Sequence, residues 1–462
     1  EGKLKKWENP LSEWKHISDP APDSIKIMEE AGQIILYFPP ALSYYPFREE
    51  SCSLFINSLG VSLGRKFRKY EIDVRTNNCS LDQLVPNYFR KNSDLDSSRL
   101  PVKRSEKKIP VINSERIYPG KGLTGNSIAL WHSHGYFFEM TLDRWEYQRA
   151  KLFGTVEDVS VMGYVVQYLV PMLEKAGASV WLPRERDTQP DEIIVDNDWS
   201  TDNSELFLLP DPEIERIKEG FLLTDTLFPG YNPFRHGTSL RIKRDSAVYI
   251  PDIPEKGSYA VYISYPLLPD NCKSVKYTVN HTGGSTGFIV DQTMGGETWM
   301  YLGRFRFDKG KNSLNGSVTV KAEGTDGAKA TLDAMKFGGG MGNVARRPSA
   351  EIIKNRQSAA EKASGSIDKE PLNPDDFGWK ISGKPRFLEG SRYYLQYAGM
   401  PDTLVYSPNT YKNDYNDDYQ SRSLWVNYLA GDPDNAGKGA GQPGLGIPID
   451  LSLAFHTDAG VT

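Results

Sequence analysis

The sequence predicts an α/β domain with a mostly parallel sheet, interrupted by an all-β sandwich and preceded by a small α/β domain. Apolar runs at residues 127–131 (SIALW) and 178–182 (ASVWL) flank a helical pattern that begins near Thr155, which indicates a βαβ unit. Residues 218–342 contain short alternating runs separated by Gly, Asn, Asp and Pro, as antiparallel sandwiches do. A chain of 462 residues is also too long for one ordinary core, so two to four domains are expected.

The predicted domain boundaries follow changes in composition. Residues 1–121 form the small α/β domain and end in a charged, Pro-containing linker. Residues 122–217 and 343–462 form one discontinuous α/β domain, and residues 218–342 form the sandwich inserted into it. The polar segment 343–380 has few large apolar groups and is expected to be a surface loop or linker.

Composition excludes several classes of partner. Net charge is only -5 with acidic and basic residues interspersed, so no basic face for nucleic acid and no polybasic segment for anionic lipid is expected. No apolar run approaches 18 residues, which argues against a membrane-spanning segment in this chain. The sequence opens at Glu1 rather than Met, as a processed chain does, so a targeting segment could have been removed.

Three cysteines, Cys52, Cys79 and Cys272, lack CxxC spacing, which argues against a cysteine-based zinc site. Two arrangements remain open from the sequence. Cys52 and Cys79 could form a disulfide, or all three could be free buried thiols.

Histidines follow two of the predicted buried strands. The chain has six histidines, and His132, His134 and His456 fall at the carboxyl ends of strands, where open α/β sheets usually place their sites. A hydrolytic zinc site needs three imidazole or carboxylate ligands and one open position for water. At the start of the intervening helix, Thr155 is expected to cap, with Asp158 answering it in a capping box.

The segments WHSHG, VEDVSVMGYVVQYLVPMLEKAGASVWLPRERD and DLSLAFHTDAG resemble the zinc-dependent N-acetylmuramoyl-L-alanine amidases, which cleave stem peptides from peptidoglycan. The resemblance implies an amidase-type α/β domain in which His134, Glu157 and His456 hold Zn²⁺. Arg184 and Asp187 fall on a conserved strand end of that family, as possible substrate-binding or supporting groups.

The sequence departs from the amidase pattern at three places. His132 is an additional histidine two residues before His134, a further possible substrate-binding or supporting group, and Pro183 replaces the usual threonine. The catalytic glutamate of the family lies downstream of the last ligand, so it is expected beyond Thr462. The weaker substitutes within the chain are Glu139, Glu146 and Glu389.

The insert has a resemblance of its own. YAVYISYP, YTVNHTGGSTGFIVDQTMGGETWMYLGRFRFDKG and DAMKFGGGMGN are similar to the golvesin C-terminal-like domain found beside xanthan-lyase-type enzymes. That resemblance implies a sandwich of the carbohydrate-binding kind. Its aromatic residues could stack on sugar rings or be ordinary core, the latter being favoured: Trp299, Tyr301, Tyr265 and Tyr277.

Charged residues near the end of the chain supply further candidates. Arg392 and Arg422, on predicted helices, could hold a substrate carboxylate or make weak exposed contacts. The acidic run of Asp414, Asp417 and Asp418 could contact a cation or a substrate amine, although solvated acids are commoner. His236 and His281 lie in the sandwich and are assigned no catalytic role.

The resemblance to the amidases implies an exported zinc-dependent hydrolase, located in the periplasm, at the cell surface or outside the cell. Its substrate would be the amide between N-acetylmuramic acid and L-alanine, or a related amide in another glycan. Two alternatives remain open: a polysaccharide lyase of the xanthan type, and a non-catalytic glycan-binding protein of the surface.

Overall fold

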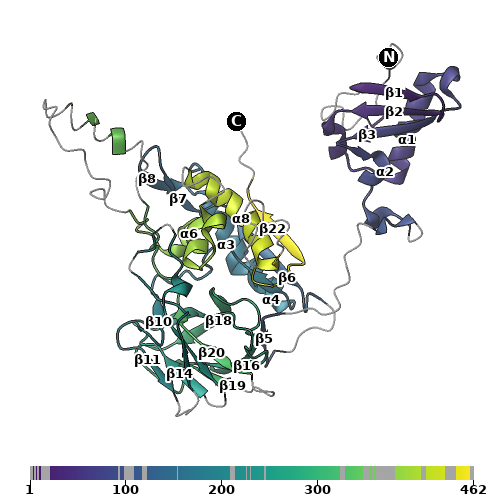
Figure 1. The fold of residues 1–462 in the computed structure, drawn as a ribbon. Helices are drawn as coiled ribbons and strands as arrows, with labels where there is room; N and C mark the ends of the chain where they lie inside the picture. The colour runs from purple at the N-terminus through teal and green to yellow at the C-terminus, as the bar shows by residue number, and fades with distance from the viewer. Residues whose placement is uncertain are drawn as a thin grey trace. The chain divides into compact units, whose positions relative to one another are not determined.

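A computed structural model gives the fold, and its chain divides into two compact units, Glu1–Ser105 and Glu106–Thr462. Each unit is described by itself (Figure 1). The structure describes residues 4, 7, 10–11, 21–91, 94–97, 109–116, 122–152, 154–208, 214–224, 226–228, 230–243, 246–322, 328–346, 353–355, 358–359, 362, 380–406, 413–431 and 444–457.

The first unit is a four-stranded sheet with helices packed on it. Its elements are β1 (Ser24–Met28), β2 (Gln33–Phe38), η3 (Pro40–Tyr44), α1 (Glu49–Leu63), η4 (Arg65–Phe67), β3 (Glu71–Thr76), β4 (Cys79–Ser80), α2 (Leu81–Leu84) and η5 (Asn87–Phe89). The strand order is β1-β2-β3-β4, with β2 and β3 parallel and the other pairs antiparallel. Phe38 and Phe55 meet edge to face in its core.

The cysteines are free thiols, so of the two alternatives the disulfide is wrong. Cys52 and Cys272 are buried, whereas Cys79 is only partly buried. Burial is the main reason why the pKa of the Cys52 thiol rises to about 11, which makes it a poor nucleophile near neutral pH.

The second unit contains a parallel three-stranded sheet. Its order is β22-β6-β9, formed by β6 (Ser127–His132), β9 (Ser179–Trp181) and β22 (Leu451–Phe455). The crossover from β6 to β9 runs through α3 (Glu157–Tyr164), the π-helical η8 (Val165–Leu169) and α4 (Val170–Lys175). Val161, Val165 and Val170 pack against Ile128 and Leu130 of β6, so the apolar side of the crossover lies on the sheet.

The remaining sheets are antiparallel. A six-stranded sheet has the order β11 (Glu205–Leu208), β14 (Ser246–Ile250), β19 (Ser317–Ala322), β16 (Val275–His281), β17 (Gly284–Val290), β5 (Val111–Asn113). A four-stranded sheet has the order β10 (Ile193–Val195), β21 (Met335–Phe337), β15 (Gly257–Ile263), β18 (Met300–Phe307). Smaller sheets join β12 (Glu215–Ile217), β13 (Ser239–Ile242) and β20 (Ala330–Leu332), and β7 (Tyr136–Glu139) with β8 (Arg144–Tyr147).

The predicted fold class, an α/β domain with a mostly parallel sheet, is wrong. Among the described residues of the second unit, parallel pairing between named strands is confined to β22, β6 and β9, and the other sheets are antiparallel. After β9 the chain does not add another parallel strand, because β10 pairs antiparallel with β21. The unit is therefore predominantly β, with a small parallel sheet beside larger antiparallel ones.

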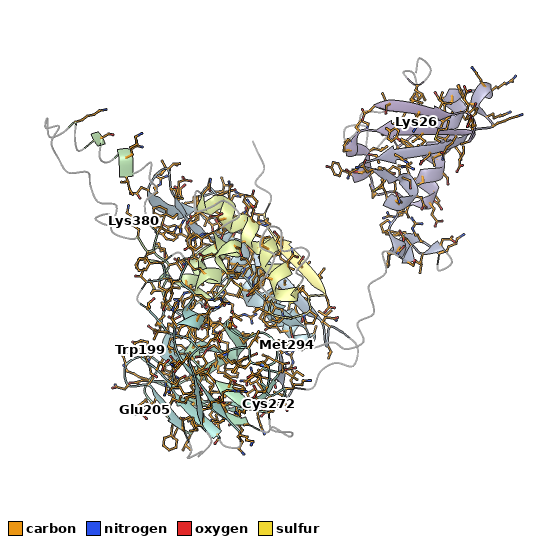
Figure 2. The ribbon with its side chains drawn as sticks, viewed as in Figure 1. Lys26, Trp199, Glu205, Cys272, Met294 and Lys380 are labelled. Atoms are coloured by element: carbon orange, nitrogen blue, oxygen red, sulfur yellow. The ribbon has the colours of Figure 1, made fainter. Side chains whose placement is uncertain are left out.

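Two segments outside residues 218–342 contribute strands to the sandwich. β5 comes from the predicted linker and pairs with β17. β10, β11 and β12 come from the segment after β9 and pair with β21, β14 and β13. Side chains from the two large sheets form one core that includes Tyr249, Tyr259 and Phe307. Figure 2 draws the side chains and labels Cys272 and Met294, both buried in this unit.

The last helices pack on one another next to the parallel sheet (Figure 1). They are η11 (Arg386–Leu388), α6 (Ser391–Tyr397), α7 (Asp402–Val405) and α8 (Asp414–Ala430), and an earlier short turn is η9 (Pro233–Arg235). α8 ends at Gly431, which takes the left-handed conformation with φ 73°. Within the part of the chain that the structure describes, no helix is both long and apolar enough to cross a membrane.

Candidate metal centre

The register of the parallel sheet brings two histidines together. Phe455 of β22 pairs with His132 of β6, so both strands end at the same edge of the sheet. His456 follows Phe455 directly, and His134 lies two residues beyond its partner. The imidazole rings of His134 and His456 are consequently 4.6 Å apart between centroids.

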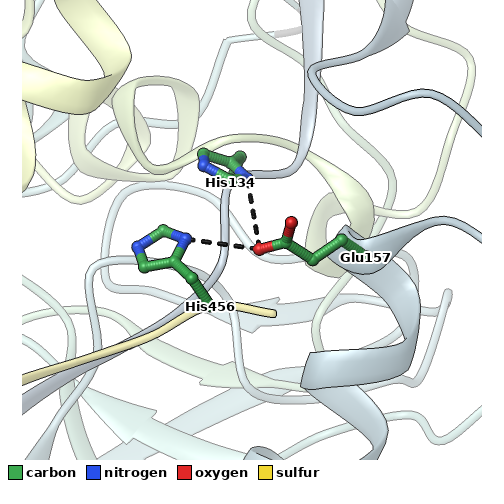
Figure 3. A group of neighbouring side chains, drawn as sticks. All are labelled: His134, Glu157 and His456. Carbon is green, nitrogen blue, oxygen red and sulfur yellow. Dashed lines mark ion pairs between the residues drawn. The ribbon is translucent and has the colours of Figure 1, made fainter. Parts of the chain in front are cut away.

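Glu157, the first residue of α3, completes the group (Figure 3). Its Oε1 lies 3.3 Å from His456 Nδ1 and 3.9 Å from His134 Nδ1. One ligand atom from each of the three residues lies within 4.8 Å of the others. Three donor atoms this close together could be held by one metal ion. The donor set of two imidazoles and one carboxylate is that of hydrolytic zinc sites.

Neighbouring side chains hold this group in place. Ser133 has the left-handed φ of 60° and donates its hydroxyl to Glu157 Oε1 at 2.9 Å. Asp158 Oδ1 accepts the backbone N–H groups of His134 at 3.0 Å and Gly135 at 2.9 Å, and lies 3.1 Å from His134 Nδ1. When Asp158 accepts a proton carried by Nδ1, Nε2 is left with the lone pair that a metal requires.

The predicted capping box at this helix is wrong. The N-cap is Val156, without a side-chain cap, and α3 begins at Glu157. Asp158 is buried and turns toward the histidine loop rather than toward Thr155. An aspartate at this position can either cap the helix or hold a neighbouring histidine, so the sequence could not distinguish the two roles of Asp158.

Gly135 is required by its surroundings. Its φ is 117°, and a Cβ at this position would lie 2.7 Å from the backbone carbon and oxygen of Glu389. The close approach is needed because Tyr136 O accepts the N–H of Gly390 at 2.9 Å, which joins the histidine loop to the chain before α6.

Electrostatics favour the protonation states that metal binding needs. Partial burial, followed by the charges of His134 and Arg422, lowers the pKa of His456, although Glu157 opposes this effect. Burial raises the pKa of Asp158, but hydrogen bonds from His134 and Gly135 outweigh it, so the net pKa is lowered. At neutral pH the arrangement therefore presents a neutral imidazole at His456 and an ionised carboxylate at Asp158.

His132 and Arg184 lie next to the three candidate ligands. His132 is fully buried, and neither ring nitrogen has a hydrogen-bond partner among the described residues. Burial and the nearby arginines lower the pKa of His132 well below its ordinary value. Arg184 donates to the backbone oxygens of His132, Phe387 and Glu389, at 2.7, 3.1 and 2.9 Å. Arg184 thus ties the end of β6 to the chain before α6.

The other predicted substrate-binding residues are buried in ion pairs and hydrogen bonds. Asp187 Oδ2 accepts the N–H of Ala260 at 2.5 Å, and its Oδ1 lies 3.5 Å from Arg304. Arg392 lies 3.7 Å from Asp414, with its guanidinium 3.9 Å from the Tyr406 ring centroid. Arg422 pairs with Asp418 one turn earlier in α8, and Asp417 is also buried. Asp187 therefore packs against the sandwich, whereas Arg392 and Arg422 lie in the interior of the helical layer, and none of the three is on the surface.

Sequence reasoning missed Arg149, which follows β8. Its Nε lies 3.7 Å from Glu157 Oε2, and its Nη1 donates to the Tyr415 hydroxyl at 3.0 Å. Arg149 also lines a hollow of about 700 Å³ between the end of β8 and the start of α3. No motif marks an arginine in this loop, so only the tertiary structure reveals it.

The three glutamates predicted as substitutes for the catalytic base lie in different surroundings. Glu139 accepts the N–H and hydroxyl of Thr141, both within its own hairpin. Glu146 lines the same hollow as Arg149, which none of the three candidate ligands lines, and pairs with Arg144 at 2.7 Å. Glu389 is fully buried, and burial is the main reason why its pKa rises to about 7.

Most of the aromatic candidates in the sandwich belong to its core. Tyr265, Tyr277 and Trp299 are at most 5% exposed, so they cannot stack on a sugar at the surface. The favoured alternative of ordinary core residues is confirmed for these three. Tyr301 is partly exposed, with the Arg186 guanidinium 3.9 Å from its ring centroid.

Comparison with known proteins identifies part of the antiparallel region. Residues 229–338 match the Golvesin C-terminal domain. The predicted resemblance of the insert to this family is therefore confirmed, and the Golvesin C-terminal domain spans strands β13 to β21. A xanthan lyase of Bacillus sp. (strain GL1) is 35% identical over 94 residues, which make up 20% of this chain and 10% of the lyase. The chain thus covers only a tenth of that curated relative.

Solved structures show weaker similarity. Paenibacillus xanthan lyase has 23% identity and a TM-score of 0.23, over 32% of this chain and 13% of the lyase. The CBM35 module of Cellvibrio japonicus Abf62 has 17% identity and a TM-score of 0.17, over 29% of this chain and 94% of the module. These TM-scores are too low to establish a shared fold.

Proposed function

We propose that this protein is a zinc-dependent hydrolase that acts on an amide in a bacterial cell-wall glycan. The convergence of His134, Glu157 and His456 carries the proposal, because two strand ends and a helix start deliver three metal-binding groups to one place. When bound there, zinc would polarise the substrate carbonyl and activate water for attack. The donor set also fits zinc better than calcium or magnesium, which prefer oxygen ligands.

The surrounding residues have defined tasks in this proposal. Asp158 holds His134 with its proton on Nδ1, and Ser133 orients the Glu157 carboxylate. Arg149, with its charge beside Glu157 and its side chain lining the hollow, is placed to bind an acidic group of the substrate. Glu146 lines the same hollow, which reaches the start of α3 at Val156, and would exchange protons with a substrate that extends into it.

The substrate class rests on two supports. The Golvesin C-terminal domain and the 94-residue similarity to xanthan lyase connect the chain with glycan-acting proteins. The finer proposal, the bond between N-acetylmuramic acid and L-alanine, rests on the amidase-like residues around the three ligands. Such a substrate would place the protein outside the cytoplasm, in the periplasm, at the cell surface or beyond it.

Metal content tests the site. We expect about one zinc per chain by elemental mass spectrometry of protein purified without added metal. His134→Ala, Glu157→Ala and His456→Ala should each lose it, while His236→Ala, a histidine of the Golvesin C-terminal domain, should retain it. A wild-type protein that binds no zinc even after readdition would remove the hydrolase proposal.

Product analysis separates the hydrolase from its rival. The xanthan lyase similarity favours one alternative, a polysaccharide lyase, which would release unsaturated sugars that absorb ultraviolet light without needing zinc. The amidase should instead release peptides with a free N-terminal L-alanine from muropeptides. Removal of zinc by a chelator should stop this reaction. Binding of glycan with neither product would support the third reading, a non-catalytic glycan-binding protein.

A further inference from the structure

Apart from the hollow lined by Arg149, a cleft lies between the antiparallel sandwich and the parallel sheet of the same unit. Its volume is about 730 Å³, within the range of roughly 300–1,000 Å³ that is usual for ligand sites. Strands β5, β9 and β18 contribute to its walls, and each is an edge strand of its sheet. None of the three proposed zinc ligands lines it. The cleft is therefore a site separate from the metal centre.

Aromatic rings form much of the cleft wall. Trp181 lies on β9, while Trp299, Tyr301 and Phe305 come from the Golvesin C-terminal domain. The indole nitrogens of Trp181 and Trp299 are buried, so they are not exposed to a ligand in the cleft. The rings of Trp181, Tyr301 and Phe305 are partly exposed. Their apolar faces suit the apolar faces of a sugar ring.

The charged side chains of the cleft are mostly basic. Arg116, Arg186 and Arg304 line it, whereas Glu174 is its one acidic lining residue among those described. Glu174 is already paired with Arg186 at 2.8 Å. The side chain of Arg304 is 48% exposed, and its contact with Asp187 is long at 3.5 Å, so it can also reach a ligand. The excess of arginine favours an anionic occupant with planar acceptors, such as a carboxylate.

We propose that this cleft binds a carboxylate-bearing segment of a glycan chain, independently of the metal centre. An extended peptide could in principle add to one of the three edge strands. The aromatic wall favours a sugar instead, since a peptide added to an edge strand would be bound mainly by its backbone. The sandwich and the parallel sheet would then both contact the bound glycan. If the proposed hydrolase activity holds, this contact would lie away from the bond that is hydrolysed.

Calorimetric titration of the metal-free protein tests this proposal without involving zinc. The probes are an oligosaccharide containing glucuronic acid, the same oligosaccharide with its carboxylates reduced to alcohols, and an acidic extended peptide. We expect the acidic sugar to bind about tenfold more tightly than its reduced counterpart. Arg304→Gln should abolish that preference, and Trp181→Ala should weaken both sugars about tenfold.

Matched variants outside the cleft serve as controls. Trp199 and Arg216 have exposed side chains and do not line it, so Trp199→Ala and Arg216→Gln should bind like the wild type. His134→Ala should also bind normally, which separates this site from the metal centre. Equal affinity for both sugars, preference for the peptide, absence of sugar binding, or equal losses in the control variants would overturn the proposal. Arg304→Gln alters a half-exposed side chain, so it keeps the test decisive if Trp181→Ala fails to fold.

Discussion

Replacing Asp158 by asparagine should weaken zinc binding while leaving the chain folded. Asp158 Oδ1 accepts two backbone N–H groups of the histidine loop, and the carbonyl oxygen of an asparagine can still accept them. The substitution removes the negative charge 3.1 Å from His134 Nδ1, which favours the proton on that nitrogen. Loss of such a supporting carboxylate typically lowers metal affinity about 10–100-fold. That range corresponds to about 1.4–2.7 kcal/mol of binding free energy.

Competition with a chromogenic zinc chelator measures this affinity directly. Asp187→Asn provides the matched control, because Asp187 is equally buried and also accepts a backbone N–H, but from Ala260 in the sandwich. The control should leave zinc affinity unchanged. A folded Asp158→Asn protein whose zinc dissociation constant stays within a factor of two of the wild type would refute the reasoning. An equal loss in the Asp187 variant would refute it as well.

Three further predictions concern stability. Gly135→Ala should lower the free energy of unfolding, measured by chemical denaturation, by about 1–3 kcal/mol more than Gly154→Ala does. Both glycines have positive φ, but only at Gly135 do backbone atoms lie where the Cβ would go. Equal losses in the two variants would contradict this. Lys336→Met should lower the free energy of unfolding by about 3–5 kcal/mol. Lys336 and Glu185 form a fully buried ion pair, and the substitution leaves the Glu185 carboxylate without its cation. A loss below about 1 kcal/mol would contradict this prediction. Burial raises the pKa of Asp333 to about 7, above the value of about 4 in an unfolded chain. The free energy of unfolding should therefore fall as pH rises from about 4 to 7. If Asp333→Asn leaves this dependence on pH unchanged, the assignment to Asp333 is contradicted.

The sequence by itself determined the local elements of the candidate site. Alternating and continuous apolar runs marked β6, β9 and β22, and placed histidines directly after two of them. The same reasoning located the antiparallel region that matches the Golvesin C-terminal domain, because hairpin patterns repeat within short stretches of chain. Glu157 was found through its place in a familiar motif, since an acidic residue at a helix start has no distinctive pattern of its own.

Only the tertiary structure decided how the strands pair and what lies between them. β22 and β6 are more than 300 residues apart in sequence, and the pairing of Phe455 with His132 is a long-range contact that no local pattern encodes. β5 and β10 are three-residue strands whose antiparallel partners lie in the sandwich, so the predicted mostly parallel sheet was wrong. The supporting role of Asp158, the approach of Arg149 to Glu157 and the arginine-rich cleft arise from the same cause. Each depends on side chains that burial and strand pairing bring together from distant segments, whereas periodicity reports only on neighbours along the chain.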